Sequence, residues 1–172
     1  MKLRFVTSND FISAAIRAGE YGFWASHAEA VMPDATYLGA HIDGGVKARP
    51  PGYDAKAMRR ELFVTLPATG EQDAAFYVFL RGQVGKPYDM EAIAALVAER
   101  DWRAPDSWFC SELQAAALEA CGQLPKLAAD VAKITPRDLL LILSGRVAIP
   151  EIVPQQQEKA DATIAMGDRS RA

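Results

Sequence analysis

Three side chains suited to nucleophilic catalysis stand out in this sequence: its only two histidines, His27 and His41, and Cys110. Both histidines fall in one short strand-like stretch, whereas Cys110 begins a segment with helical periodicity. A thiol attacks a carbonyl carbon as the thiolate, and the free N–H groups and partial positive charge of a helix N-terminus stabilise that anion. The same amides are suited to hold an oxyanion. The pattern therefore indicates a cysteine nucleophile with an imidazole base.

The second cysteine, Cys121, lies at the other end of the same predicted helix. Eleven residues of helix separate the two thiols by about 16 Å, which is beyond the reach of a disulfide. We therefore expect separate thiols in a reducing compartment. Cys121 lacks the field of a helix N-terminus and is typical of a small core residue, so the reactive thiol should be Cys110.

The histidines lie on a predicted β-hairpin. Residues 26–32 and 36–42 are strand-like and flank a turn that contains proline. A pairing centred on the turn makes His27 and His41 near cross-strand neighbours, so one imidazole can orient the other. If the helix that begins at Cys110 packs against this hairpin, Cys110 becomes the nucleophile, His27 the base and His41 the orienting third member of a triad.

The remaining elements predict an α+β domain, with an antiparallel sheet packed against the helix from Cys110 and further helices outside. The sheet should contain the histidine hairpin and strand 61–66, and residues 46–49 are expected to extend the second hairpin strand. Besides the helix from Cys110, the predicted elements are a strand at 3–7 and helices at 11–19, 69–85, 90–99 and 136–145.

Composition narrows the class of protein. The chain has 172 residues, half of them hydrophobic, which suits one domain over residues 1–150 followed by a polar, flexible tail at 151–172. A net charge of −3 argues against binding to nucleic acid or an anionic membrane. No apolar run approaches the roughly 20 residues of a membrane helix or forms an export signal, so we expect a cytoplasmic protein without integral membrane association. No cysteine or histidine cluster has metal-ligand spacing, and we expect no cofactor and no metal.

Three short motifs resemble a known family. They are Trp-Ala-Ser-His-Ala-Glu at 24–29, Gly-Lys-Pro-Tyr-Asp at 85–89 and Phe-Cys-Ser-Glu-Leu at 109–113. In their order and spacing they resemble the circularly permuted papain-like cysteine peptidases of the NlpC superfamily, in particular the YiiX-like branch. Lecithin retinol acyltransferase-like proteins are more distant relatives. The resemblance covers roughly residues 3 to 145 and implies a permuted papain-like fold in which the histidine precedes the cysteine.

Carried over to this sequence, the resemblance implies Cys110 as the nucleophile and His27 as the base. Tyr88 matches a family tyrosine that lines the site and helps to position the substrate or the cysteine, whereas Asp89 and Glu112 match structural positions. We therefore expect Tyr88 to belong to a substrate-binding surface beside Cys110.

The third member of the triad has three candidates. Many YiiX-like proteins place a glutamate on the second hairpin strand, where this chain offers His41 and then Asp43. The acyltransferase relatives and many unpermuted members use histidine there, which favours His41. Glu29, two residues after His27 on the same strand, is the lesser alternative.

The resemblance implies acyl chemistry through an acyl-enzyme thioester. The first hypothesis is a thiol-dependent amidase or peptidase whose partner is a peptide, amide or acyl substrate. The alternatives are an acyltransferase or thioesterase acting on a lipid, or a non-catalytic binding module on the same fold. A cell-wall substrate would require delivery by a phage lysis system or by secretion machinery.

Overall fold

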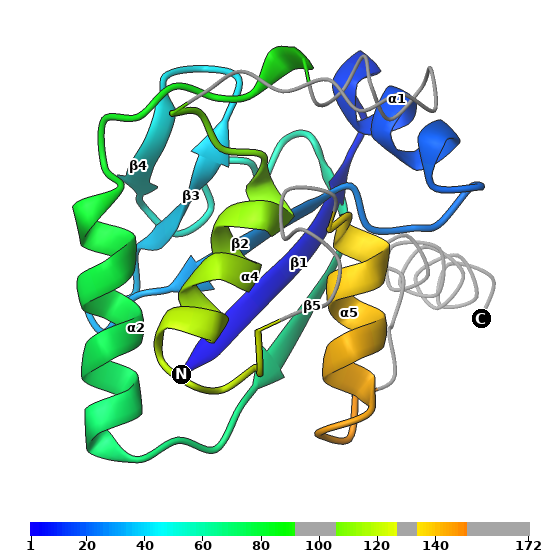
Figure 1. Ribbon diagram of the computed structural model, residues 1–172. Helices are drawn as coiled ribbons and strands as arrows, with labels where there is room; N and C mark the ends of the chain where they lie inside the picture. The colour runs from blue at the N-terminus through cyan, green and yellow to red at the C-terminus, as the bar shows by residue number, and fades with distance from the viewer. Residues whose placement is uncertain (92–105, 127–133, 151–172) are drawn as a thin grey trace, which may run out of the picture.

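The fold is known from a computed structural model that describes residues 1–91, 106–126 and 134–150. Its centre is a five-stranded antiparallel sheet in the order β4-β3-β2-β1-β5 (Figure 1). The strands are β1 (Lys2–Ser8), β2 (His27–Val31), β3 (Tyr37–His41), β4 (Gly45–Arg49) and β5 (Met58–Thr65). The sheet therefore contains both the predicted histidine hairpin and the predicted strand at 61–66.

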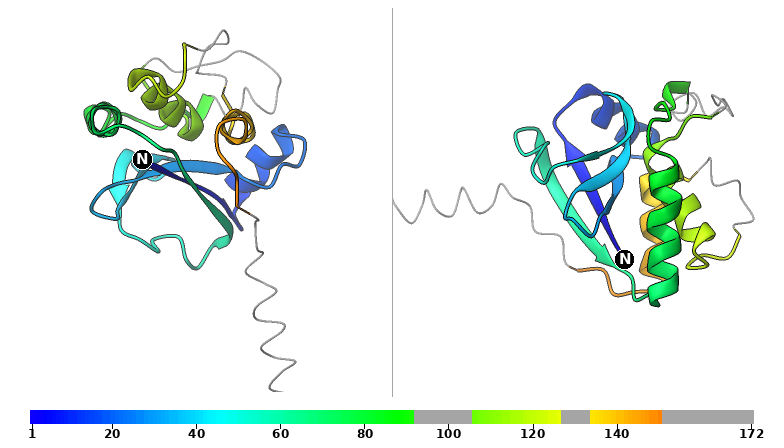
Figure 2. Two further views of the ribbon diagram at one scale, coloured as in Figure 1. Left: turned by 90° about the horizontal axis from the view of Figure 1, so that it is seen from below. Right: turned by 90° about the vertical axis from the view of Figure 1, so that its left-hand side faces the viewer.

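Four helices are described: α1 (Phe11–Gly19), α2 (Gly70–Gly82), α4 (Cys110–Ala120) and α5 (Pro136–Ser144). Figure 2 shows α2, α4 and α5 together on one face of the sheet. This arrangement confirms the α+β class and the packing of the helix from Cys110 against the hairpin. The predicted helix at 90–99, apart from its first two residues, and the predicted tail at 151–172 lie outside the described residues.

The hairpin has the predicted pairing. Ala30 lies opposite Leu38 and Val31 opposite Tyr37, a register centred on the middle of the connecting turn. Ala35 in this turn has a φ of 66°, which closes the tight connection. With this register fixed, side chains equally far from the turn on the two strands become neighbours.

Small residues allow α4 to lie close to the hairpin. Ala28 and Ala30 of β2 and Ala40 of β3 are fully buried in the main hydrophobic core. The amide nitrogen of Gln114 in α4 donates a hydrogen bond of 3.2 Å to the carbonyl oxygen of Leu38. This bond attaches the helix to the strand that carries His41, which sets the position of the helix N-terminus.

The prediction for residues 46–49 is wrong. This segment does not extend the second hairpin strand but forms part of β4, a separate strand antiparallel to β3. Gly44 and Gly45 have φ values of 104° and 65°, and they reverse the chain between the two strands. A Cβ at Gly45 would collide with the carbonyl oxygen of Lys86, so this close approach requires glycine.

Candidate active site

Cys110 is the first residue of α4 and is fully buried. Its small cluster includes Ile16 of α1 and Phe109, with Tyr88 packed against them. The carboxylate of Glu112 accepts the N–H of Phe109 at 3.1 Å, which caps the helix start. The sulfur therefore stands at the positive end of a helix whose first turn is held rigidly.

The segment at 85–89 positions the surroundings of Cys110. Gly85 donates its N–H to the carbonyl oxygen of Val46 at 2.9 Å, and Val46 donates in return to Lys86 at 2.9 Å. These bonds attach the segment to β4 at the edge of the sheet. Because of these bonds, the residues after Lys86 run alongside the chain that leads into α4.

Tyr88 forms a parallel bridge with Trp108, two residues before the nucleophile candidate. Trp108 donates its N–H to the carbonyl oxygen of Pro87 at 3.1 Å. The ring centroid of Tyr88 lies 6.0 Å from that of Phe109. Burial, followed by the charge of Cys110, raises the pKa of Tyr88 above its ordinary range. Tyr88 therefore lies beside Cys110, where the sequence analysis expected it.

The two imidazoles stand together at one end of the hairpin. His27 is the first residue of β2 and His41 the last of β3. Their ring centroids are 4.0 Å apart and their planes are inclined by 54°. The side chains retain only 14% and 16% exposure. The structure thus brings the two predicted histidines into direct contact.

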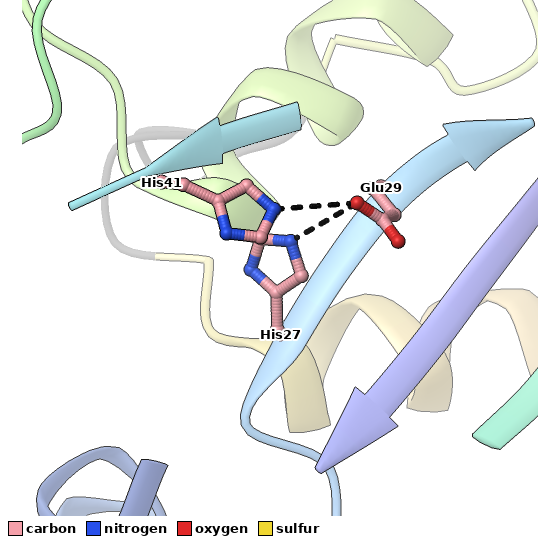
Figure 3. Close-up of side chains that lie close together, drawn as sticks. All are labelled: His27, Glu29 and His41. Atoms are coloured by element: carbon pink, nitrogen blue, oxygen red, sulfur yellow. Dashed lines mark hydrogen bonds and ion pairs between the residues drawn. The ribbon is translucent and has the colours of Figure 1, made fainter. Parts of the chain in front are cut away.

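Figure 3 shows the carboxylate of Glu29, on β2, facing both imidazole rings. Its Oε2 is 3.5 Å from Nε2 of His27 and 3.3 Å from Nε2 of His41. Its Oε1 accepts a hydrogen bond of 2.6 Å from Nη1 of Arg4. The carboxylate, which is fully buried, therefore contacts both histidines at once.

Two residues of this network were missed by the sequence analysis. The Tyr53 hydroxyl is 2.8 Å from Nε2 of His41 and 3.2 Å from Oε2 of Glu29. Arg4, almost fully buried, bonds to Glu29, Asp54 and Glu61. No local motif marks either residue. The one signal available is an arginine between the apolar residues Leu3 and Phe5, at a position that alternation turns away from the helices.

The electrostatic balance favours a charged His27. Burial alone would lower the pKa of His27, but the charge of Cys110, a hydrogen bond with Cys110 and the interaction with Glu29 together raise this pKa to about 9. Burial would likewise raise the pKa of Glu29, yet its bonds with the two histidines and the charges of His27 and Arg4 hold that pKa well below its usual range. An imidazolium beside the sulfur is the form that stabilises a thiolate.

The second imidazole behaves in the opposite way. Burial, and then the positive charge of His27, lower the pKa of His41 to about 4, although Glu29 opposes the shift. At neutral pH the pair therefore consists of one charged ring at His27 and one neutral ring at His41.

Asp43, the other candidate for the third position, faces elsewhere. Its carboxylate is 3.0 Å from Nη2 of Arg49, and its side chain is 72% exposed. Its carbonyl oxygen also accepts hydrogen bonds from Lys47 and Arg49. It serves the β3–β4 turn, whereas Glu29 makes the contact with His27.

A cavity of about 250 Å³ opens beside the histidines. His27, His41, Tyr53 and Tyr88 contribute polar groups to its wall. The rest of its wall is mixed and includes the aliphatic side chains of Ile12, Ile16 and Ile42 beside the polar side chains of Asp10, Ser13 and Ser26. A larger hollow of about 380 Å³ lies near Trp24, Arg59 and Arg60, but its lining contains no histidine or cysteine. The smaller cavity is therefore the one lined by both histidines; Cys110 itself is not among its lining residues.

Comparison with known proteins does not indicate a family or a function. No family model matches the sequence, and no curated protein is significantly similar to it. None of the helices within the described residues has the length and apolar character needed to cross a membrane. The chemistry and geometry of the site therefore carry the functional proposal.

Proposed function

We propose that this protein is a thiol-dependent hydrolase that cleaves amide or ester bonds through an acyl-enzyme thioester on Cys110. The single observation that supports this most strongly is the interaction between His27 and Cys110, at the N-terminus of α4. Burial opposes a charged His27, but Cys110 and then Glu29 raise the pKa of His27 to about 9. A thiolate paired with an imidazolium is the reactive form of the cysteine nucleophiles. The order of these two residues in the chain also agrees with the proposed relationship to the permuted NlpC-type peptidases.

The proposed reaction begins with attack of the Cys110 sulfur on the substrate carbonyl carbon, which forms the C–S bond and moves the carbonyl π electrons onto oxygen. The N–H of Cys110 belongs to the first turn of α4, where backbone donors have no acceptor within the helix. This donor stabilises the oxyanion. His27 then gives its proton to the leaving group as the C–N or C–O bond breaks. Water, deprotonated by His27, subsequently hydrolyses the thioester.

In this mechanism Glu29 is the third, positioning member. Its Oε2 lies 3.5 Å from Nε2 of His27. A buried carboxylate in this place fixes the ring and stabilises its positive charge. His41, which the sequence analysis favoured for this role, is proposed here to support Glu29 together with Tyr53.

The cavity limits what reaches the sulfur. Cys110 is fully buried, and the 250 Å³ cavity lined by the two histidines is the approach that we propose for the substrate. Its size suits a small acyl group or a single side chain of a larger substrate.

Three isoleucines in the cavity wall favour one alternative, namely transfer or hydrolysis of a lipid-derived acyl group. Ile12, Ile16 and Ile42 would contact an acyl chain in the cavity. In that case turnover of p-nitrophenyl esters should rise from acetate to butyrate and then fall once the chain exceeds the cavity. Equal turnover of all chain lengths, with faster cleavage of anilide amides, would favour an amidase.

The proposal is tested by steady-state hydrolysis of p-nitrophenyl acetate. The wild-type protein and Cys121→Ala, its matched cysteine control, should turn over at similar rates. Cys110→Ala and His27→Ala should lose at least about a hundredfold in kcat/KM. Circular dichroism should report the same fold for all four proteins. Equal rates in the wild-type and Cys110→Ala proteins would overturn the proposal.

A further inference from the structure

Folding gathers three side chains suited to metal binding from two strands: His27 and Glu29 of β2 and His41 of β3. Within the described residues, His27, Glu29 and His41 offer one donor atom each, and these atoms lie within 4.8 Å of one another. The sequence analysis expected no metal because none of these residues belongs to a cysteine or histidine cluster with ligand spacing. The register of β2 and β3, rather than local spacing, creates the group.

The two distances from Glu29 to the imidazole nitrogens are longer than ideal hydrogen bonds and close to the donor spacing around a tetrahedral metal. Oε2 of Glu29 is 3.5 Å from Nε2 of His27 and 3.3 Å from Nε2 of His41, whereas N–H···O bonds are typically about 2.9 to 3.0 Å. Metal–ligand bonds of about 2.0 to 2.1 Å in a tetrahedron place neighbouring donors about 3.4 Å apart. Nε2 of His27 is buried and completes no good hydrogen bond to the described residues.

The surroundings support the three donors as a metal site. Two imidazole nitrogens and one carboxylate oxygen are a donor set that Zn²⁺ accepts, with a fourth position left for another ligand. Arg4 holds the other oxygen of Glu29 at 2.6 Å, and so fixes the direction of the carboxylate. The Tyr53 hydroxyl, 2.8 Å from Nε2 of His41, is placed to bond to a ligand in that fourth position.

We propose that His27, Glu29 and His41 bind a borderline divalent cation such as Zn²⁺ and that the bound cation inhibits the thiol reaction. The cation would use the Nε2 lone pair of His27 and draw Glu29 into coordination. His27 could then neither rotate nor be stabilised as the imidazolium partner of Cys110. The metal site stands on its own geometry, whereas the inhibition rests on the proposed function.

The binding half is tested with Co²⁺, whose ligand-field absorption reports the coordination of a site that also suits Zn²⁺. Titration of the Cys110→Ala protein should show one equivalent of bound Co²⁺ and a visible spectrum of tetrahedral type. His41→Ala in the same background should weaken binding by about tenfold or more. Asp43→Asn, which removes the nearby exposed carboxylate on the β3–β4 turn, should leave the affinity unchanged.

Two results would overturn the metal site. The first is the absence of a Co²⁺ spectrum in the Cys110→Ala protein when the wild-type protein shows one, because the metal would then be held by the thiol. The second is unchanged affinity after His41→Ala. Neither result depends on turnover, so the metal site and the proposed function fail separately.

The inhibitory half is tested in the wild-type protein. Added Zn²⁺ should slow both p-nitrophenyl acetate hydrolysis and alkylation of Cys110 by iodoacetamide, and a chelator should restore both rates. The alkylation rate keeps the test valid if the ester is a poor substrate. Unchanged alkylation at saturating Zn²⁺, or hydrolysis by the Cys110→Ala protein that Zn²⁺ stimulates, would contradict inhibition.

Discussion

At the scale of single residues, Glu29 connects the two histidines of the site to the buried Arg4. One oxygen contacts both histidines and the other accepts a hydrogen bond from Arg4 at 2.6 Å. The carboxylate is fully buried, so its charge acts in a medium that screens it weakly. Its removal should therefore affect His27 more than the loss of any exposed carboxylate would.

Glu29→Gln is expected to lower kcat for ester hydrolysis by about ten- to a thousandfold, because the amide keeps the shape but removes the charge that stabilises the His27 imidazolium. Glu61→Gln is the matched control. Glu61 also bonds to Arg4, at 2.9 Å, but its side chain is 29% exposed, and within the described part of the chain its ion pair is with Arg4 and not with a histidine. It should retain kcat within about twofold. Equal losses in both variants would mean that Glu29 acts only through Arg4.

Gly39 is a second residue on which the geometry depends. It lies on β3, and a Cβ there would be 2.9 Å from the Cβ of Glu29 and 3.5 Å from Nε2 of His27. Gly39→Ala should therefore lower the free energy of unfolding by about 1 to 3 kcal/mol and reduce turnover. Gly70→Ala is the control, because nothing lies within 4 Å of its added methyl group. Urea unfolding of both variants checks this expectation, and equal stability would contradict it.

Sequence reasoning located the residues that belong to local motifs and missed those joined over long distances. Cys110 and Tyr88 each lie in a short recognisable segment, and the hairpin register brought His27 next to His41. Arg4 and Tyr53 could not be found in this way, since their partners depend on how β1 and the segment after β4 cross the sheet. The position of the Glu29 carboxylate, 3.5 Å from Nε2 of His27, likewise depends on side-chain rotamers.

At the scale of elements, α1 covers the site and is joined to α5. Ile16 of α1 packs in the Cys110 cluster, and Glu20 follows the end of the same helix. Oε1 of Glu20 accepts the backbone N–H of Arg137, in the first turn of α5, at 2.9 Å. The second carboxylate oxygen of Glu20 is buried without a hydrogen-bond partner among the described residues. Burial raises the pKa of Glu20 to about 7.

The buried carboxyl group of Glu20 predicts that the free energy of unfolding depends on pH. Because the pKa of Glu20 is raised on folding, the native state binds its proton more tightly than the unfolded state, and stability falls as pH rises from about 4.5 to 7. Glu20→Gln removes this loss. Relative to wild type, its free energy of unfolding should therefore increase by about 1 to 3 kcal/mol between pH 4.5 and pH 8.

Denaturant unfolding at the two pH values measures this difference. Glu71→Gln is the control, because Glu71 is an exposed acid in the first turn of α2. It should show little change in relative stability over the same range. A Glu20→Gln protein whose stability follows that of the wild type at both pH values would contradict the buried, protonated state of Glu20.

The prediction of elements succeeded where capping residues mark the start of a helix. Asp10 accepts the N–H of Ser13 at the start of α1, and Thr69 exchanges hydrogen bonds with Gln72 at the start of α2. The sequence analysis failed at β4, because a strand that continues and a strand that reverses share the same residue types. The two positive φ values at Gly44 and Gly45 decided between them.

At the scale of the whole molecule, Arg4 connects the sheet to the segment that covers its other face. Its guanidinium lies 2.6 Å from Glu29 of β2, 2.9 Å from Glu61 of β5 and 3.0 Å from Asp54 in the connection between β4 and β5. The three carboxylates raise the pKa of Arg4 above its usual range in spite of its burial. A planar group with several donors is needed to satisfy three directions at once.

Arg4→Lys should therefore lower the free energy of unfolding by about 2 to 4 kcal/mol, because an ammonium group leaves part of this buried network unpaired. Arg59→Lys, at an exposed position on β5, should change it by less than about 0.5 kcal/mol. Thermal unfolding followed by circular dichroism compares the two variants. Equal midpoints would show that Arg4 contributes no more than a surface arginine.

The central claim is that Cys110 carries the acyl group during turnover. It is tested most directly by mixing the protein with p-nitrophenyl acetate, quenching in acid and mapping the modified residue by mass spectrometry. We predict one acetyl group, on Cys110, in the wild-type and Cys121→Ala proteins, and much slower acetylation of the same residue in His27→Ala. Acetylation confined to lysines or to Cys121, at the same rate with and without His27, would contradict the account.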